Sequence, residues 1–223
     1  MIKKEIEILK PFVTEERLAK FEKIIAYRTK YATVVLEDIY QPHNASAVLR
    51  SCELFGVQDV HIIENDNKYS VNPDVAVGSS KWLTLNKYSE SKNNTLQAIN
   101  SLKQQGYRIV ATTPHTNDVE LQDFDVTKGK FALVFGSEMP GITDLVMENA
   151  DEYLKINMYG FTESFNISVS VAIILHELTE KLKKSNVKWQ LSEEEQDEIM
   201  LNWLKITIKD ADGIIKIKKN NEQ

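Results

Sequence analysis

Three apolar runs in this sequence are each followed by a short polar segment whose side chains suit chemistry. The segments carry, in order, Asn44 with Arg50, Gly136 with Glu138, and Ser164 with Asn166. Amide, guanidinium and carboxylate groups of this kind orient a polar substrate and stabilise charge that develops during a reaction. If the three runs are parallel strands of one sheet, their ends meet at one edge, where ligands bind in open α/β sheets.

The third segment joins a strand end, a polar loop and the start of a helix. The strand ends near Ile156, and from Phe165 onward apolar residues recur at helical spacing. Asn166 and Ser168 suit the helix entry, because their side chains accept hydrogen bonds from backbone N–H groups. From this stretch alone, helix capping and chemistry both stay open as interpretations.

Strands and helices are predicted to alternate, which favours an α/β fold with a parallel sheet. Strands are expected at 32–37, 60–63, 82–85, 108–113, 131–135 and 153–156, and helices at 14–29, 45–55, 94–105, 142–148 and from 165. The run 131–135 is the most apolar and suits the centre of the sheet. Asn44 is the expected N-cap of the helix that Gly56 ends. The loop before that helix lacks the glycine pattern of a dinucleotide site.

The composition is that of a globular protein, with 223 residues, 42% hydrophobic and 27% charged. That length suits one domain with small extensions. No run reaches the apolar length of a membrane-spanning helix, and the first residues lack the apolar core of a signal peptide, so we expect a cytoplasmic protein without membrane contact. The single Cys52 lies among apolar neighbours, which indicates a buried thiol and not a nucleophile. No metal-ligand spacing is present, so no metal is expected.

The formal net charge is −6, but its distribution is uneven. Residues 1–30 hold 8 basic and 5 acidic side chains, whereas residues 31–180 hold 10 and 20. The helix at 14–29 carries four basic residues outside its apolar face, Arg17, Lys20, Lys23 and Arg28. These residues indicate either a helix that packs on the core with solvated lysines or a basic platform for RNA.

Three longer motifs around these residues carry a family resemblance. They are Pro42-His-Asn-Ala-Ser-Ala-Val-Leu-Arg50, Phe135-Gly-Ser-Glu-Met-Pro-Gly-Ile142 and Ile156-Asn-Met-Tyr-Gly-Phe-Thr-Glu-Ser-Phe-Asn-Ile-Ser-Val169. In this order they resemble the three motifs of the SpoU branch of the SPOUT RNA methyltransferases, over about residues 14 to 184. The short N-terminal segment further resembles the TrmH subfamily, which methylates the 2′-hydroxyl of a D-loop guanosine at position 18 of tRNA.

The resemblance implies a SPOUT-type α/β knot, with a parallel sheet between helices and a deep trefoil knot in its C-terminal half. It implies short helical extensions at both ends, N-terminal at 1–30 and C-terminal at 185–223, around a methyltransferase domain at 31–184. It also implies a homodimer that binds tRNA.

The cofactor implied by the resemblance is S-adenosylmethionine. By motif position, the residues that contact it are Thr112, Gly136, Ile156, Met158 and Phe165. The catalytic residues implied in the same way are Arg50, Asn44, Glu138, Ser164 and Asn166. Arg50 is the family's base, but a guanidinium is a poor proton acceptor, which makes stabilisation of phosphate and of the developing alkoxide an equal alternative.

Two positions depart from the family pattern, and two other functions remain to be weighed. Phe165 stands where leucine is usual and Asn157 where proline is usual, beside the expected cofactor site. An rRNA 2′-O-methyltransferase of the same branch is the first alternative, because RNA choice depends on the termini. A non-catalytic RNA-binding relative is the second, and the retained polar residues argue against it.

Overall fold

The computed structural model describes residues 1–69, 76, 78–114, 119–139 and 141–220. The chain forms two compact units, one of Lys30–Trp189 and one of Met1–Thr29 together with Gln190–Gln223. The two terminal segments, which the sequence analysis treated as separate extensions, therefore belong to a single unit.

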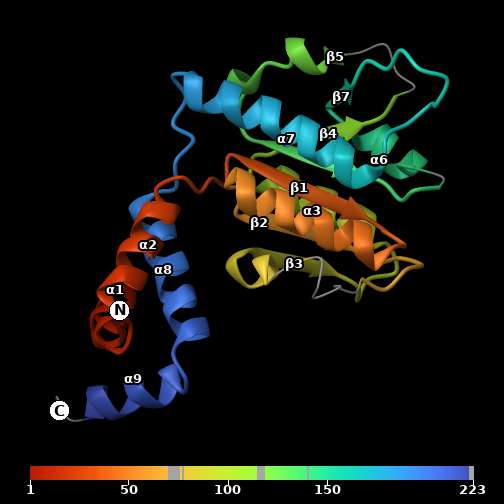
Figure 1. The fold of residues 1–223 in the computed structure, drawn as a ribbon. Coiled ribbons are helices and arrows are strands. Elements are labelled where there is room, and N and C mark those ends of the chain that lie inside the picture. Colours follow the sequence, from red (N-terminus) through yellow and green to blue (C-terminus); the bar gives the residue numbers. More distant parts are fainter. Residues whose placement is uncertain (70–75, 77, 115–118, 140, 221–223) are drawn as a thin grey trace. The chain divides into compact units, whose positions relative to one another are not determined.

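The larger unit is built on a seven-stranded sheet in which every paired strand is parallel (Figure 1). The strands are β1 (Ala32–Glu37), β2 (Asp59–Ile63), β3 (Thr84–Tyr88), β4 (Arg108–Thr112), β5 (Val119–Glu120), β6 (Phe131–Phe135) and β7 (Glu152–Lys155). Their order is β3-β2-β1-β6-β4-β7-β5, so β6 occupies the centre, as its apolar sequence predicts. The predicted α/β class is confirmed, and the trefoil knot stays a prediction.

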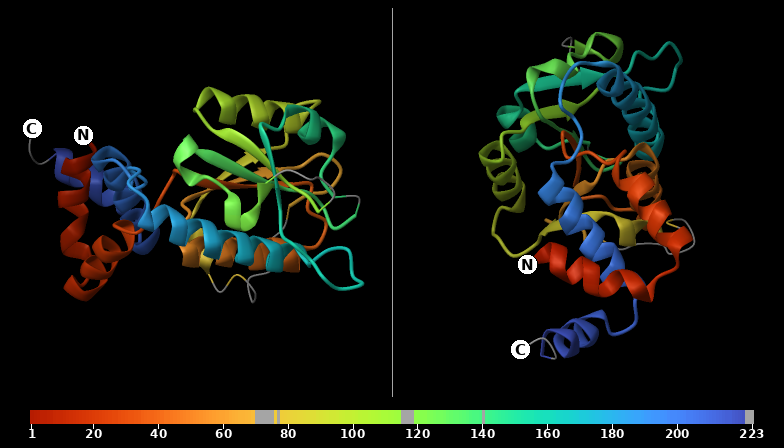
Figure 2. Two further views of the ribbon diagram at one scale, coloured as in Figure 1. Left: turned by 90° about the horizontal axis from the view of Figure 1, so that it is seen from above. Right: turned by 90° about the vertical axis from the view of Figure 1, so that its left-hand side faces the viewer.

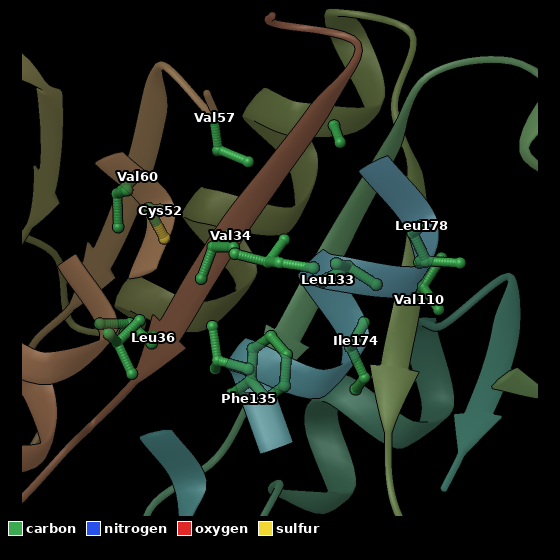
Figure 3. Close-up of a cluster of buried hydrophobic side chains, with 14 of the residues drawn as sticks. Val34, Leu36, Cys52, Val57, Val60, Val110, Leu133, Phe135, Ile174 and Leu178 are labelled. Carbon is green, nitrogen blue, oxygen red and sulfur yellow. The ribbon is translucent and has the colours of Figure 1, made fainter. Parts of the chain in front are cut away.

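Helices cover both faces of this sheet. On one face lie α3 (Pro42–Phe55) and α7 (Ile167–Lys184), which pack against each other, and on the other lie α5 (Asn94–Gln104) and α6 (Asp144–Asn149). Side chains alternate between the faces along each strand: Val34 and Leu36 of β1 contribute to the first core, and Val35 to the second. Figure 3 shows the first core, where Cys52 of α3 is fully buried, as predicted.

Two predicted boundaries are wrong in ways that matter for the site. Helix α3 begins at Pro42, and its N-cap is Gln41 and not Asn44. Proline suits the first helical turn, because backbone N–H groups at that position have no acceptor within the helix and proline, which lacks this group, loses no hydrogen bond. Asn44 therefore lies inside the first turn, with its amide free for other contacts. The strand expected at 82–85 begins later, at Thr84, because Ser79–Trp82 forms a 3-10 turn.

The smaller unit consists of helices α1 (Ile2–Leu9), α2 (Glu15–Ile25), α8 (Glu193–Thr207) and α9 (Ala211–Asn220). Helix α8 packs against α1 and α2, and both views of Figure 2 show them side by side. Both terminal extensions are helical, as predicted, although only α2 was given bounds from the sequence; its N-cap Thr14 accepts a hydrogen bond from the N–H group of Arg17. Ser192 and Glu195 form a capping box that begins α8.

Arg28 is not part of an exposed basic platform, contrary to the prediction. Its side chain is 1% exposed, and its guanidinium lies 5.3 Å from the ring centroid of Trp203. Phe21 contacts the same indole edge-to-face at 5.4 Å. The cation stacks on an aromatic face from the other end of the chain, which is a packing role. Among the helices that the structure describes, none is long and apolar enough to cross a membrane.

His61 gives a prediction about stability and pH. It is 2% exposed on β2, its Nδ1 lies 3.1 Å from the Tyr88 hydroxyl, and burial lowers the pKa of the imidazole from 6.5 to about 4. Below pH 6.5 the unfolded chain therefore binds a proton that the folded chain excludes, so stability falls as the pH falls. From pH 7 to pH 5 this histidine should remove about 2 kcal/mol from the free energy of unfolding.

Replacing His61 with phenylalanine should remove this contribution. Urea unfolding at pH 7 and pH 5 measures the change in both proteins, and the wild type should lose about 2 kcal/mol more than His61→Phe. Equal losses in the two proteins would show that the pKa of His61 is the same in the folded and the unfolded chain.

Candidate active site

The predicted site residues follow four strands that are neighbours in the sheet. In the order β1-β6-β4-β7, parallel strands bring their carboxyl ends to one edge. Asn44 follows β1, Glu138 follows β6, Thr112 ends β4, and the segment 156–166 follows β7. Loops far apart in sequence are thereby gathered at a single edge.

A chain of hydrogen bonds joins three of these loops. The Asn44 side-chain N–H group donates to Oε1 of Glu138 at 2.5 Å, and Nδ2 of Asn166 donates to Oδ1 of Asn44 at 3.0 Å. Asn44 is only 4% exposed, so both ends of its amide are satisfied away from solvent. The structure thus brings together three of the five predicted catalytic residues, one from each motif.

Asn166 both caps a helix and belongs to the site, so the two interpretations of this residue are compatible. Its Oδ1 accepts hydrogen bonds from the backbone N–H group of Ser168 at 2.9 Å and from the hydroxyl of Ser168 at 2.6 Å. These bonds begin α7, while the amide nitrogen points to Asn44. The start of α7 is therefore fixed to the site.

Glu138 retains an unused acceptor. Its Oε2 atom is buried and has no hydrogen-bond partner among the described residues. A buried acceptor without a partner is costly, and such atoms in native proteins call for an explanation. A donor group from a bound substrate would satisfy it.

The loop after β6 is closely packed at its glycines. A Cβ atom on Gly136 would lie 2.1 Å from the carbonyl carbon of Gly141, so no side chain fits there. Gly141 has φ 95°, a conformation that glycine adopts without strain. Glycine at 136 is therefore required by the close approach of the Gly141 backbone in the same loop.

The predicted cofactor residues provide groups that fit S-adenosylmethionine. From 157 to 165 the described backbone makes no hydrogen bond to other backbone groups, which leaves N–H and C=O groups for the edge of an adenine ring. Ile156 packs against the core and Phe165 is 43% exposed, so apolar walls are present as well. Thr112 donates to the carbonyl oxygen of Val134 at 2.8 Å, which ties the end of β4 to β6.

Asn157, one of the two departures from the family pattern, has a structural partner. Its Nδ2 donates to Oε2 of Glu120 at 2.7 Å. This bond holds the start of the loop to β5, where the family's proline would restrict the backbone.

The sequence analysis missed a buried acid at the same edge. Glu37, the last residue of β1, is 1% exposed and accepts hydrogen bonds from Thr95 and Thr143. The signal was present in the sequence as a carboxylate that ends an otherwise apolar strand. Its donors lie 58 and 106 residues further along the chain, so their proximity was not predictable.

Asp38, directly after Glu37, was missed as well. It has φ 55°, and its Oδ1 accepts three backbone N–H groups at 2.8 to 3.0 Å, from Asn65, Asp66 and Asn67. A positive φ at a residue other than glycine is strained, and strain of this kind gathers at functional sites. Asp38 thereby fixes the loop after β2 to the end of β1.

The match to known proteins agrees with this geometry. The sequence profile of the SpoU rRNA Methylase family matches residues 31–176. The chain belongs to the SpoU methylase family. It is 44% identical over 206 residues to the tRNA (guanosine(18)-2′-O)-methyltransferase of Borreliella burgdorferi, and the match covers 92% of each chain. The resemblance drawn from the three motifs is confirmed.

Solved structures show the same fold. The TrmH/SpoU tRNA modifying enzyme of A. aeolicus is similar with a TM-score of 0.76 and 30% identity, over 88% of this chain and 98% of that chain. An AdoMet-bound rRNA methyltransferase from Sinorhizobium meliloti is similar with a TM-score of 0.60 and 19% identity, over 71% of this chain and 59% of that chain.

Two predicted catalytic residues of this SpoU methylase lie outside the hydrogen-bonded network. Arg50 is exposed on α3, and Ser164 is exposed in the loop after β7. Neither side chain has a hydrogen bond or ion pair within the part of the chain that the structure describes. Among those same residues, no group of three or more His, Cys, Asp and Glu side chains is placed to hold a metal ion.

The predicted RNA-binding residues on α2 are exposed, apart from Arg28. Arg17, Lys20 and Lys23 are spaced three residues apart, and none has a side-chain ion pair among the described residues. Other lysines of this unit are engaged: Lys3 pairs with Glu193, and Lys10 pairs with Glu7.

Replacing Asn44 with alanine should disconnect the three loops. The change leaves the Glu138 carboxylate and the Asn166 amide without their shared partner, so we expect a loss of roughly 1–3 kcal/mol in the free energy of unfolding. Urea unfolding measures it. The control is Asn149→Ala, which removes an amide whose hydrogen-bond partner within the described chain is the carbonyl oxygen of Leu145 in its own helix, and it should cost less. Equal costs would contradict a buried network centred on Asn44.

Proposed function

We propose that this protein transfers a methyl group from S-adenosylmethionine to the ribose 2′-hydroxyl of guanosine 18 in tRNA, in the cytoplasm. The observation that carries the proposal is the extent of the match to the Borreliella burgdorferi enzyme. The family profile ends at residue 176, whereas that match covers 92% of both chains and so includes terminal segments. RNA choice depends on those segments.

The network supports this chemistry. Bound S-adenosylmethionine supplies an electrophilic methyl carbon on a sulfonium. Glu138 and Asn166, joined through Asn44, hold the loops after β6 and β7 in fixed relation, so a bound ribose is aligned for attack. We assign to Oε2 of Glu138 a hydrogen bond from the ribose 2′-hydroxyl, because that atom is buried and has no partner among the described residues. The same oxygen would take the hydroxyl proton as the 2′-oxygen receives the methyl group.

We assign Arg50 an electrostatic role. A guanidinium offers several N–H donors and no acceptor, so it suits stabilisation of a developing alkoxide and orientation of a phosphate better than removal of a proton. Its exposed position on α3, with no ion pair inside the described chain, leaves the charge available for RNA.

We further propose that the active form is a homodimer. Leu54 on α3 is 71% exposed and Val169 on α7 is 43% exposed, and these two helices pack side by side. Exposed apolar surface of this kind marks an interface, and a second copy would cover it.

The helical unit is proposed to bind the tRNA backbone. Arg17, Lys20 and Lys23 are exposed on α2 without ion pairs among the described residues, so they are free to neutralise phosphates.

The test of the reaction and its substrate is methyl transfer from labelled S-adenosylmethionine to an unmodified tRNA transcript. A matched transcript with 2′-deoxyguanosine at position 18 is the control. Label in the first transcript and none in the second is the expected result. Label in both would show that a nucleotide other than guanosine 18 is methylated. Transfer to ribosomal RNA alone would favour the rRNA alternative.

Arg50→Ala should lower kcat by roughly 100-fold or more, because removal of one stabilising donor has an effect of that size. The affinity for S-adenosylmethionine, measured by calorimetry, should change less than about two-fold. Lys92→Ala is the control for loss of an exposed cation and should leave both quantities unchanged. A large loss of cofactor affinity in Arg50→Ala would refute the assigned role.

Replacing Arg17, Lys20 and Lys23 together with alanine should weaken tRNA binding and flatten its salt dependence. Each lost phosphate contact removes about 0.7–0.9 from the slope of log K against log salt, so the slope should fall by about 2 to 3. Filter binding at several salt concentrations measures it. The control replaces Lys3 and Lys10, which are already paired with acids, and should leave the slope unchanged.

A further inference from the structure

Glu37 is a buried carboxylate with three hydrogen-bond donors. Its Oε1 accepts from the hydroxyls of Thr95 at 2.7 Å and Thr143 at 2.8 Å, and its Oε2 accepts from the backbone N–H group of Thr143 at 3.1 Å. At 1% exposure it would be costly without them. Two of the three bonds go to one residue, Thr143.

Thr143 is where the loop after β6 ends. It is the N-cap of α6, and its hydroxyl accepts from the N–H group of Val146 at 3.4 Å. The loop begins at Gly136, which packs against the backbone of Gly141 with no space for a side chain. Glu37 and the glycine contact therefore fix the two ends of the segment that carries Glu138.

We infer that Glu37 is a positioning residue for methyl transfer, acting through Thr143. By holding the loop 136–143 to the end of β1, it places Glu138 so that its carboxylate receives the Asn44 amide at 2.5 Å. Asn44 itself follows β1, so the same strand end sets both partners of that bond. The inference rests on the proposed function.

Thr95 fixes the orientation of the Glu37 carboxylate. Its hydroxyl donates to Glu37 and accepts from Nδ2 of Asn65 at 2.9 Å. The first turn of α5 and the loop after β2 thus hold the carboxylate toward Thr143.

Two substitutions at Glu37 separate positioning from charge. Glu37→Gln keeps an oxygen for the Thr143 N–H group, and both threonine hydroxyls are able to accept from its amide. Glu37→Leu keeps the approximate volume but leaves the Thr143 N–H group without an acceptor. Glu37→Leu should lower kcat roughly 10- to 100-fold, because small displacements in a site have effects of that size. Glu37→Gln should stay within about three-fold of the wild type, and tRNA affinity should stay within about two-fold in both.

The control is Thr33→Val on the same strand. Thr33 is fully buried and its hydroxyl donates to the carbonyl oxygen of Asp59 at 2.6 Å, at the opposite end of β1. The Thr33→Val variant loses this buried hydrogen bond, which lies away from the site. The substitution should therefore lower thermal stability without changing kcat.

Hydrogen exchange of residues 136–143 in the protein without cofactor gives a readout that does not need activity. Exchange there should be roughly ten-fold faster in Glu37→Leu than in the wild type and unchanged in Thr33→Val. If Glu37→Leu does not fold, Thr143→Val removes the hydroxyl bond to Glu37 and Thr143→Ser restores it, and the same contrast in kcat and exchange is expected.

The outcomes are distinct. Equal kcat and equal exchange in Glu37→Leu and Thr33→Val would overturn the inference. Loss of kcat in Glu37→Gln equal to that in Glu37→Leu would overturn it too, by assigning the effect to the charge. If the wild type transfers no methyl group to tRNA, the proposed function fails, and the exchange data alone decide whether Glu37 holds the loop.

Discussion

The site depends on one side-chain amide that uses both of its ends. Asn44 donates from its nitrogen to Glu138 and accepts at its oxygen from Asn166, across separations of 94 and 122 residues. An aspartate in this place has no donor at neutral pH, and a leucine has neither group. A hydrogen bond to a carboxylate is also stronger than one between neutral groups. One residue therefore joins the first turn of α3, the loop after β6 and the start of α7 in a way that no other common side chain of its size reproduces.

That amide is in position because of the sheet beneath it. Strands β1, β6, β4 and β7 are neighbours and parallel. The loops that follow them therefore all lie at the carboxyl edge of the sheet. Helices α3 and α7, which begin at the site, pack on the same face and are anchored by apolar residues such as Val48 and Val171. Asn44 and Asn166 thus lie at the starts of two packed helices, and Glu138 lies in the loop that follows the central strand.

The sequence predicted the parts of this arrangement that local pattern determines. Apolar runs located every strand but the two-residue β5, and the composition of 131–135 placed β6 at the centre. The three motifs predicted that Asn44, Glu138 and Asn166 belong together. Asn44 was nevertheless misassigned as a cap, because its side chain suits a cap and the competing effect of Pro42 at the first helical turn was not considered.

What the sequence did not predict involves contacts between distant segments. Glu37 has donors 58 and 106 residues away, and the burial of Arg28 depends on Trp203 near the other end of the chain. A charged side chain is predicted to be exposed when the sequence does not reveal its partners, because burial of a charge without partners is unfavourable. Helices were predicted in both terminal extensions, but only α2 was given bounds, and the packing of α8 against α1 and α2 joins segments from the two ends of the chain.

Some polar side chains at the site have hydrogen-bond partners within the described chain, and others do not. Within the described residues, Glu37, Asn44 and Asn166 have partners for their side chains, whereas Glu138 keeps one buried oxygen free. Arg50, by contrast, is an exposed cation without an ion pair there. A substrate that brings a donor for the first and an anion for the second would satisfy both. Under the proposed function, a ribose hydroxyl would supply the donor and an RNA phosphate the anion.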